Sequence, residues 1–376
     1  MDRRPAKLFS RIGKLDRQTP KPTSTNRVRD LYWRMQQSPE RVRLDRMFAQ
    51  WSTTLRSRFV FKMQEPVATP VPVELLAEEI SRLPKHRCLA ESGDLAVYLA
   101  TSGEVPHLLR EVGRLRELTF RHVGEGTGKS VDLDRFDRDY EHVLLWNRNI
   151  GELVGGYRAG NTTQIVAKHG IGGLYTSTLF RYDERVFQKL GPALELGRSF
   201  VRPEYQRQYA PLLLLWKGIA RLVATRPETP VLFGAVSISR DYSGASREMI
   251  YRFFEARMRG DELAGLIEAR RPFRPPLLGS RDCRAMCRAL RDMEDLSQQI
   301  VRLEADGKGL PILLRQYAKI GGKMLGFNVD RKFSGVLDGL VVVDLRQTEA
   351  AVLDRYMGRD GAAQFREFHE TQHASI

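Results

Sequence analysis

The chain has 376 residues, which allows either one large domain with extensions or two domains. Hydrophobic residues make up 42% of it, enough to bury a sizeable core. No apolar run approaches the roughly 20 residues needed to span a bilayer, and the first residues lack the apolar segment of a secretory signal. These features exclude a protein with membrane-spanning helices, and we expect it to stay in the cytoplasm.

Three cysteines, Cys88, Cys283 and Cys287, fit a reducing compartment better than a disulfide framework. Cys283 and Cys287 lie four residues apart on one face of an expected helix, but no histidine or further cysteine lies near them. We interpret them as packing residues, and we expect no metal site and no resident cofactor.

The formal charge of +15 is unevenly distributed along the chain. Residues 1–64 hold 16 Lys and Arg against 5 Asp and Glu, a net charge of +11, so the other 312 residues carry only +4. Residues 1–28 are polar and turn-rich, which predicts disorder. Residues 42–55 place apolar side chains at helical spacing with arginines between them, which predicts a basic amphipathic helix. This helix either lies on an anionic membrane or packs on the body with its basic face in solvent, and both interpretations stay open.

The pattern becomes regular after this arm. The sequence "QEPVATPVPVE" (64–74) is typical of a proline-rich linker. The elements expected next, in chain order, are a helix at 73–83, a turn and strand at 88–100, a helix at 105–123, a strand–turn–strand at 142–160, a strand at 193–201, a helix at 210–225, a strand at 231–243, helices at 246–254 and 281–303, and a final strand at 330–345.

This mixture predicts an α/β (α+β) fold in which helices flank a mixed central sheet. We divide the chain into a basic arm (1–64), a linker with one helix (65–85), a main domain (86–345) and a helical C-terminal tail (346–376).

The segment "GEGTGKS" (124–130) is a poor match to a phosphate-binding loop. A Walker A loop has four residues between its first glycine and the Gly-Lys pair, and here Val123 occupies the required glycine position. We therefore interpret the segment as a flexible loop and a candidate active-site lid.

Several polar residues are candidates for a site, although each is also compatible with a structural or surface role. Asp134 and Asp137 lie three apart and could hold a cationic ligand, and Arg116 and Phe120 lie four apart on an expected helix. Arg158 ends the expected strand "LVGGYR".

Glu195 and Arg198 stand in the otherwise apolar strand "ALELGRSFV". Side chains alternate between the faces of a strand, so a regular strand would place these two on opposite faces. A bulge near Gly197 would bring both to one face. Because a buried charge is costly unless it is paired, this pair indicates either a functional site or a structural ion pair.

The following segment, "VRPEYQRQYAP", leads into an apolar helix as phosphate-gripping loops do. Such loops use glycines, whereas Tyr209, Ala210 and Pro211 occupy those positions here, and proline has no N–H to donate. We take Arg202, Arg207 and Tyr209 as candidate donor-binding residues.

The run "LELGRSFVRPEYQ", with "LLLLWKGI" and "LFGAVSIS", resembles motif A of the GNAT acyltransferase superfamily. More specifically, residues 88–345 resemble the ornithine-lipid N-acyltransferase (hemolysin-like) branch, which is related to the acyl-homoserine-lactone synthases. The resemblance implies a GNAT-like fold and a thioester of acyl carrier protein as the acyl donor, without acyl-CoA.

The lactone synthases share a functional set that this chain matches in order. The resemblance implies that Arg116, Phe120, Asp134, Asp137 and Arg158 bind substrate. It also implies that Glu195 and Arg198 are catalytic, with Glu195 as the base that deprotonates the acceptor amine, directly or through water, and with backbone N–H groups of the central strand stabilising the oxyanion.

We therefore predict transfer of a 3-hydroxyacyl group from acyl carrier protein to the α-amine of an amino acid, with ornithine as the acceptor that the resemblance implies. Glycine is an alternative acceptor. A catalytically inactive membrane-binding protein is the alternative function, and we find no nucleic-acid recognition motif. The basic surface would attract the acidic carrier protein and the inner face of an anionic membrane, where we expect peripheral contact. The His-x4-Asp signature of lysophospholipid acyltransferases is absent.

Overall fold

The structure is a computed structural model, and it describes residues 64–275, 287 and 289–373. The predicted basic arm and Cys283 lie outside the described residues, so both stay predictions.

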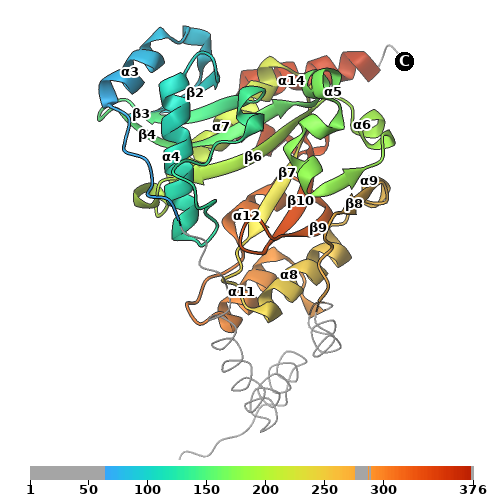
Figure 1. Cartoon of the computed structure of the whole chain (residues 1–376). Helices are drawn as coiled ribbons and strands as arrows, with labels where there is room; N and C mark the ends of the chain where they lie inside the picture. The colour runs from blue at the N-terminus through green and yellow to red at the C-terminus, as the bar shows by residue number, and fades with distance from the viewer. Residues whose placement is uncertain (1–63, 276–286, 288, 374–376) are drawn as a thin grey trace, which may run out of the picture. The chain divides into compact units, whose positions relative to one another are not determined.

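An eight-stranded sheet forms the centre of the domain (Figure 1), with the strand order β1-β2-β3-β4-β6-β7-β10-β9. All neighbouring strands pair antiparallel except β6 and β7, which are parallel. The strands are β1 (Cys88–Ser92), β2 (Leu95–Thr101), β3 (Glu141–Asn147), β4 (Glu152–Asn161), β6 (Ala193–Val201), β7 (Val231–Ile238), β9 (Lys323–Asp330) and β10 (Val336–Asp344); β5 (Phe180–Tyr182) and β8 (Ile267–Ala269) form a separate pair.

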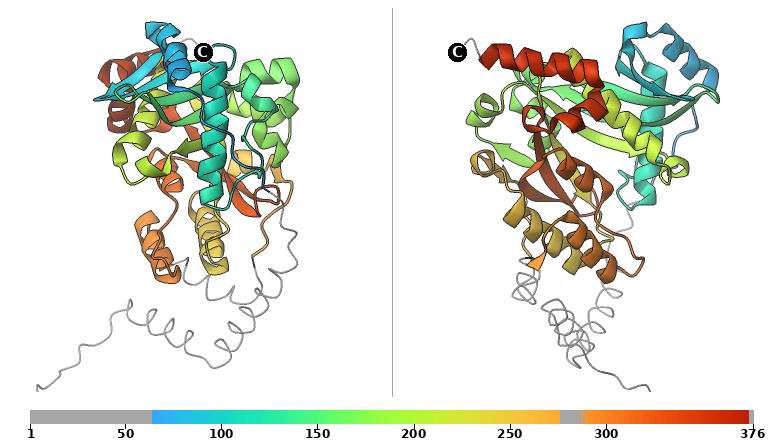
Figure 2. Two further views of the ribbon diagram at one scale, coloured as in Figure 1. Left: turned by 60° about the vertical axis from the view of Figure 1, so that its left-hand side comes forward. Right: turned by 180° about the vertical axis from the view of Figure 1, so that it is seen from behind.

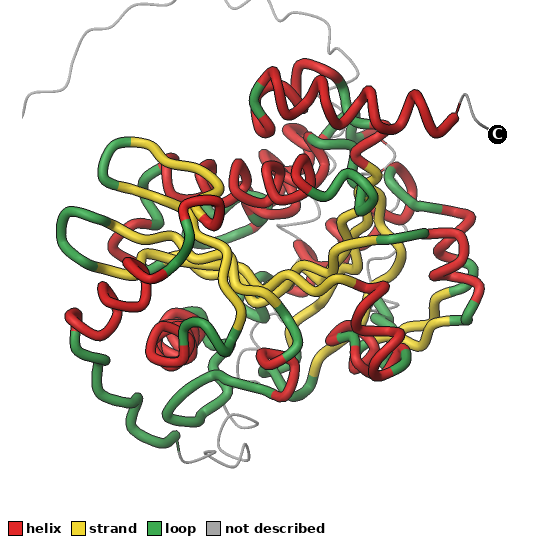
Figure 3. Tube along the Cα trace, turned by 90° about the horizontal axis from the view of Figure 1, so that it is seen from above, coloured by secondary structure: helices red, strands yellow, loops and turns green. Residues whose placement is uncertain are grey.

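Helices cover both faces of the sheet (Figures 2 and 3). Their bounds are α3 (Val73–Arg82), α4 (Pro106–His122), α5 (Thr162–His169), α6 (Arg185–Leu190), α7 (Tyr209–Thr225), α8 (Gly244–Arg257), α9 (Asp261–Ala264), α11 (Met293–Leu303), α12 (Ile312–Lys319), α13 (Ala350–Met357) and α14 (Arg359–His373). None of those in the described parts of the chain is both long and apolar enough to cross a bilayer.

The alternation of side chains along β3 explains how two layers of helices are held. Val143 and Leu145 point toward the apolar residues of α7, whereas Leu144 and Trp146 pack with α3 and α4 on the other face. Both sets are buried, so the strand reads as a continuous apolar run. The C-terminal helices α13 and α14 join the α7 side through Leu353 and Phe365.

The fold confirms the predicted mixed sheet flanked by helices. The predicted turn and strand at 88–100 is instead a hairpin of β1 and β2, and the strand β9 before the predicted final strand was missed. Within the predicted helix at 281–303, Cys287 and Ala289 are helical, the helix is interrupted at 290–292, and α11 begins at Met293.

The parallel strands β6 and β7 diverge, and cavities form where they do. The two strands pair at only three positions, the last being Glu195 with Phe233, although β6 continues to Val201 and β7 to Ile238. Beyond Glu195 the strands diverge, and the described cavities lie between and beside their separated ends. Gly234 stands directly after the last pair, where a Cβ atom would overlap the backbone oxygen of Leu196.

Gly234→Ala should therefore destabilise the protein, because the methyl group meets backbone that cannot rotate away. We expect a loss of about 1–3 kcal/mol in the free energy of unfolding, measured by urea denaturation. Gly244→Ala is the matched control, because a Cβ atom there has no neighbour within 4 Å. Equal stability of the two variants would contradict this explanation of the glycine.

Candidate active site

Two adjoining cavities lie at the divergence of β6 and β7. One is largely apolar, has a volume of about 350 Å³, and is lined by Tyr157, Phe200, Leu212 and Ile312 among others. The other has a volume of about 150 Å³ and is lined by charged side chains as well as by Leu196 and Val236. Four residues line both cavities: Phe120, Glu125, Ser199 and Leu313. A ligand with an apolar chain and a polar head would fit such a pair.

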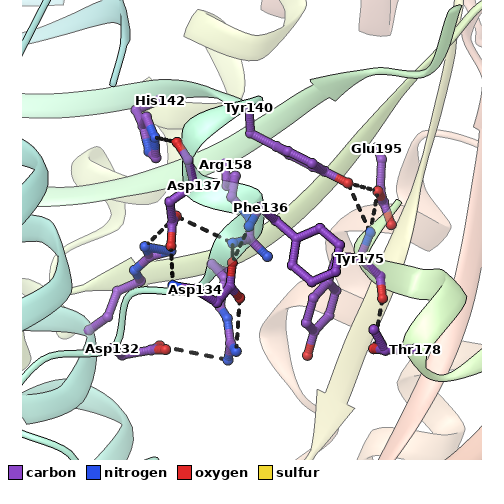
Figure 4. A network of polar contacts seen from close by, with 12 residues as sticks. Asp132, Asp134, Phe136, Asp137, Tyr140, His142, Arg158, Tyr175, Thr178 and Glu195 are labelled. Atoms are coloured by element: carbon purple, nitrogen blue, oxygen red, sulfur yellow. Dashed lines mark hydrogen bonds and ion pairs between the residues drawn. The ribbon is translucent and has the colours of Figure 1, made fainter. Parts of the chain in front are cut away.

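A buried network of arginines and aspartates lies beside the charged cavity (Figure 4). It begins at a short 3₁₀ helix, where the Asp134 side chain accepts from Phe136 N–H and the Asp137 side chain accepts from Asp134 N–H, a capping box. This local bonding explains the spacing of the two aspartates, because each one fixes the backbone that carries the other.

Arg116 and Arg158 hold these carboxylates from α4 and β4. Arg116 Nη2 donates to Asp137 Oδ1 at 2.7 Å, and Arg158 Nη1 lies 2.6 Å from Asp134 Oδ1 and 3.3 Å from Asp137 Oδ1. Both guanidinium groups are 1% exposed. Burial alone lowers the pKa of Arg158, but Asp137 and Asp134 outweigh it and raise the pKa, so this residue stays charged.

Arg198 enters the same network because of the predicted bulge. Between the pairs Gly156–Phe200 and Arg158–Gly197, two residues of β6 oppose one residue of β4, and Arg198 has a φ of 49°. Its guanidinium lies 5.1 Å from the ring centre of Tyr175 and 4.3 Å from that of Phe333. It also lies 3.7 Å from Asp132 and 3.6 Å from Asp134.

Glu195 is buried behind this layer, with 1% of its surface exposed. Its carboxylate accepts bonds from the Tyr140 hydroxyl, from Tyr175 N–H at 3.1 Å and from Thr176 N–H at 2.6 Å. Burial raises its pKa, and the donors from Thr176 and Tyr140 oppose that shift. Glu195 is not among the residues that line the two cavities. Its base role stays a prediction, and this geometry favours a positioning role.

Of the three candidate donor-binding residues, one lines a cavity and two do not. Tyr209 begins α7, lines the apolar cavity with 55% of its surface exposed, and accepts a bond from Arg355. Arg207 is exposed, and Arg202 pairs with Glu152 and Glu204. Neither arginine lines the cavities.

Three carboxylates in the charged cavity were missed by the sequence reasoning: Glu125, Asp330 and Asp338. Glu125 belongs to the loop interpreted as a candidate lid, which is anchored because the buried Glu117 accepts from Thr127 N–H and Gly128 N–H. Asp338 lies in the apolar run of β10, as Glu195 does in β6, and this was the available signal. No group of side chains in the described residues could hold a metal ion.

Comparison with known proteins identifies the family of this chain. An acetyltransferase (GNAT) domain family matches residues 115–217. A glycine N(alpha)-acyltransferase of Bacteroides thetaiotaomicron is 30% identical over 297 residues, which cover 74% of this chain and 86% of that protein. The chain belongs to the GNAT N(alpha)-acyltransferases.

Two further relatives of this acyltransferase are named for different acceptors. A glycine N(alpha)-acyltransferase of Phocaeicola vulgatus is 34% identical over 201 residues, covering 50% of this chain and 61% of that protein. An L-ornithine N(alpha)-acyltransferase of Brucella abortus is 31% identical over 166 residues, covering 40% and 54%. A CoA-dependent acyl-homoserine lactone synthase of known structure has a TM-score of 0.35 at 12% identity, covering 72% of this chain and 97% of that one, which is too distant to support an inference.

Asp137→Asn should strongly destabilise this acyltransferase, because it leaves two buried guanidinium groups without their shared carboxylate. Removing one partner of a buried pair typically costs 3–5 kcal/mol, so we expect a loss of about that size in urea denaturation. Asp139→Asn is the control two residues further on, where the carboxylate pairs with the exposed Lys168. A loss under about 1 kcal/mol at Asp137 would show that the network does not depend on it.

Proposed function

We propose that the protein transfers a fatty acyl group from acyl carrier protein to the α-amine of a small amino acid. The observation that carries this proposal is the junction of an apolar cavity with a charged one at Phe120, Glu125, Ser199 and Leu313. The acyl chain occupies the apolar cavity, the amino acid occupies the charged one, and the thioester carbonyl lies where they meet. The amine replaces the thiol on the carbonyl carbon, so a C–N bond forms and a C–S bond breaks.

The strand bulge supplies a candidate oxyanion site for this reaction. At Arg198 and Ser199 two residues of β6 oppose one residue of β4, and both residues line the charged cavity. Backbone N–H groups directed at the developing negative charge stabilise a tetrahedral intermediate without reorganisation. The bulge therefore would serve catalysis as well as the positioning of Arg198.

The N-terminus of α7 supports a carrier-protein donor. Phosphate-binding helix termini present free backbone N–H groups, often from glycines. Here Tyr209, Ala210 and Pro211 form the first turn, so the proline lacks one donor and the tyrosine side chain stands at the cavity mouth. A pyrophosphate such as that of CoA has a poor site there. The exposed Arg207 nearby has no ion-pair partner in the described part of the chain and can meet an acidic carrier protein.

The charged cavity supports a dibasic acceptor. It holds three carboxylates, from Glu125, Asp330 and Asp338, and one guanidinium, from Arg198. One carboxylate suffices for an α-ammonium group, so the others favour a second cationic group, as in ornithine. Glycine is the second candidate, because the two relatives named for glycine match this chain over longer stretches than the ornithine enzyme does.

The full chain should be incubated with 3-hydroxyacyl carrier protein or 3-hydroxyacyl-CoA, each with glycine or ornithine, and the products measured by mass spectrometry. We expect an N-acyl amino acid from the carrier-protein donor and a higher kcat/KM for ornithine than for glycine. A higher kcat/KM for glycine than for ornithine would make glycine the acceptor. Equal use of the CoA thioester would overturn acyl carrier protein as the specific donor. No product with any pair would overturn the proposed function.

Leu212→Trp should shorten the acyl chain that the enzyme accepts, because the indole would fill part of the apolar cavity. Each methylene excluded from an apolar site costs about 0.8 kcal/mol, so excluding two should lower kcat/KM roughly fifteenfold. The measurement compares donors of increasing chain length. Leu118→Trp on α4 is the control, because Leu118 is exposed and does not line the cavity. Leu222 is buried in the core, so a tryptophan there would disturb packing. A uniform loss across all chain lengths would contradict the assignment of the cavity.

A further inference from the structure

The three carboxylates of the charged cavity come from separate parts of the fold. Glu125 lies in the loop after α4, Asp330 ends β9, and Asp338 lies within β10. They share the cavity with Arg198 of β6, and Ser199, Ser237 and Tyr175 complete the polar lining. Unlike Asp134 and Asp137, none of the three forms an ion pair with an arginine among the described residues.

Asp338 is the most deeply placed of them, with 3% of its surface exposed. Its Oδ1 accepts a bond from the Ser237 hydroxyl at 2.7 Å. Its Oδ2 has no hydrogen-bond partner in the part of the chain that the structure describes, and the side chain lines the cavity. The serine therefore fixes the carboxylate while one oxygen remains available to a ligand.

Arg198 provides a second, independent sign of a ligand. Its Nε atom is buried and has no hydrogen-bond partner among the described residues. The rings of Tyr175 and Phe333 hold the guanidinium plane in place. A guanidinium edge so placed suits a carboxylate, which it can bind through parallel N–H bonds.

These observations place a hydrogen-bond donor for a carboxylate and an acceptor for an ammonium group in one cavity. Every α-amino acid carries both a carboxylate and an ammonium group. Resting on the proposed function, we propose that Arg198 binds the acceptor's carboxylate and that Asp338, rather than Glu195, removes the proton from its α-ammonium group. Glu125 and Asp330 complete the cationic side of this acceptor site. Glu195 acts as a positioning residue, because its carboxylate is already bonded by Tyr140, Tyr175 and Thr176.

Proton and charge balance in this step is simple. Asp338 takes one proton from the ammonium group, and the freed nitrogen lone pair attacks the thioester carbonyl carbon. The tetrahedral adduct loses a second proton from nitrogen as the C–S bond breaks, and the leaving thiolate takes it up. The products are the amide and the thiol, and Asp338 returns its proton to solvent.

The electrostatics agree with a base that works near neutral pH. Burial raises the pKa of Asp338 to about 7, with Asp330 and Glu125 adding to the shift and Ser237 and Arg198 opposing it. Burial likewise raises the pKa of Glu125 to about 7. A base matched to the working pH is the most effective in proton transfer.

The test compares the wild-type protein with Asp338→Asn, Glu195→Gln and Asp344→Asn, using the acyl donor and acceptor that the wild type uses. Asp344 lies at the end of the same strand and pairs with Arg346 outside the cavity. We expect the wild-type rate to rise with pH and to level off above about 7. Asp338→Asn should lower the rate about 10²–10⁴-fold and remove this limb, leaving a rate that follows the fraction of neutral amine. Asp344→Asn should have the wild-type rate and the wild-type rise of the rate with pH. Glu195→Gln should show the same rise with pH, whatever its absolute rate.

A second acceptor separates a catalytic base from a structural role. Aminooxyacetate carries a carboxylate and an amine that is already neutral at pH 7, so it needs no base. We expect Asp338→Asn to lose less than tenfold with aminooxyacetate while losing at least a hundredfold with the amino acid. Equal losses with both acceptors, or an unchanged pH limb, would overturn the role of Asp338.

Stability gives a readout that does not depend on activity. The folded pKa of Asp338 lies above the usual unfolded value of about 3.9, so its burial destabilises the fold above that pH and reaches its full cost above about 7. The thermal midpoint of Asp338→Asn should therefore exceed that of the wild type at pH 8, and the two should converge near pH 4. A lower midpoint at pH 8 would indicate a structural role. A wild type that makes no product would overturn the proposed function, whereas an active wild type with an unaffected Asp338→Asn overturns only this inference.

Discussion

The site depends on the point at which β6 and β7, the only parallel strand pair in the described sheet, stop pairing. β6 and β7 hold together at three residue pairs and then diverge, and every other neighbouring pair of the large sheet is antiparallel. Separated strands leave backbone and side chains facing open space, which a folded protein avoids unless the space is used. Here the space becomes two cavities, one apolar and one charged. The bulge at Arg198 directs a charged side chain into the second of them.

The buried ion network keeps this opening rigid. Arg116, Arg158 and Arg198 lie on three different elements and meet Asp132, Asp134 and Asp137 on the connection between α4 and β3. Buried charges are costly, and they are tolerated here because the three cations and three anions balance. Glu195 adds a fourth carboxyl group, which accepts hydrogen bonds from the backbone of Tyr175 and Thr176 and so ties β6 to that segment. The network thus positions the cavity wall.

Sequence reasoning found the network but not the cavity carboxylates, for a physical reason. Arg116, Asp134, Asp137, Arg158, Glu195 and Arg198 fall in a recognisable order, and a charged residue in an apolar strand is visible from the sequence alone. The bulge could be anticipated because Gly197 precedes Arg198. Glu125 lies in a loop more than 200 residues before Asp330 and Asp338 in the sequence. Only the sheet order brings β10, which carries Asp338, next to β7. The first strand of the hairpin at 88–101 was missed because only Cys88–Ser92 precede Gly93 and Asp94, so this short segment was assigned to the turn.

The contrast between the two sets of carboxylates bears on function. Arg158 and Arg198 lower the pKa of Asp134, so its burial is compensated within the protein. The pKa values of Asp338 and Glu125 rise, because the opposing effect of Arg198 is smaller than that of burial. A fold that needed these groups only for stability would gain by replacing them with apolar residues. Their presence is understandable if the substrate supplies a compensating cation. An amino acid brings an ammonium group and a carboxylate. The cavity offers the Asp338 carboxylate to the first, and to the second the Nε atom of Arg198, which has no hydrogen-bond partner among the described residues.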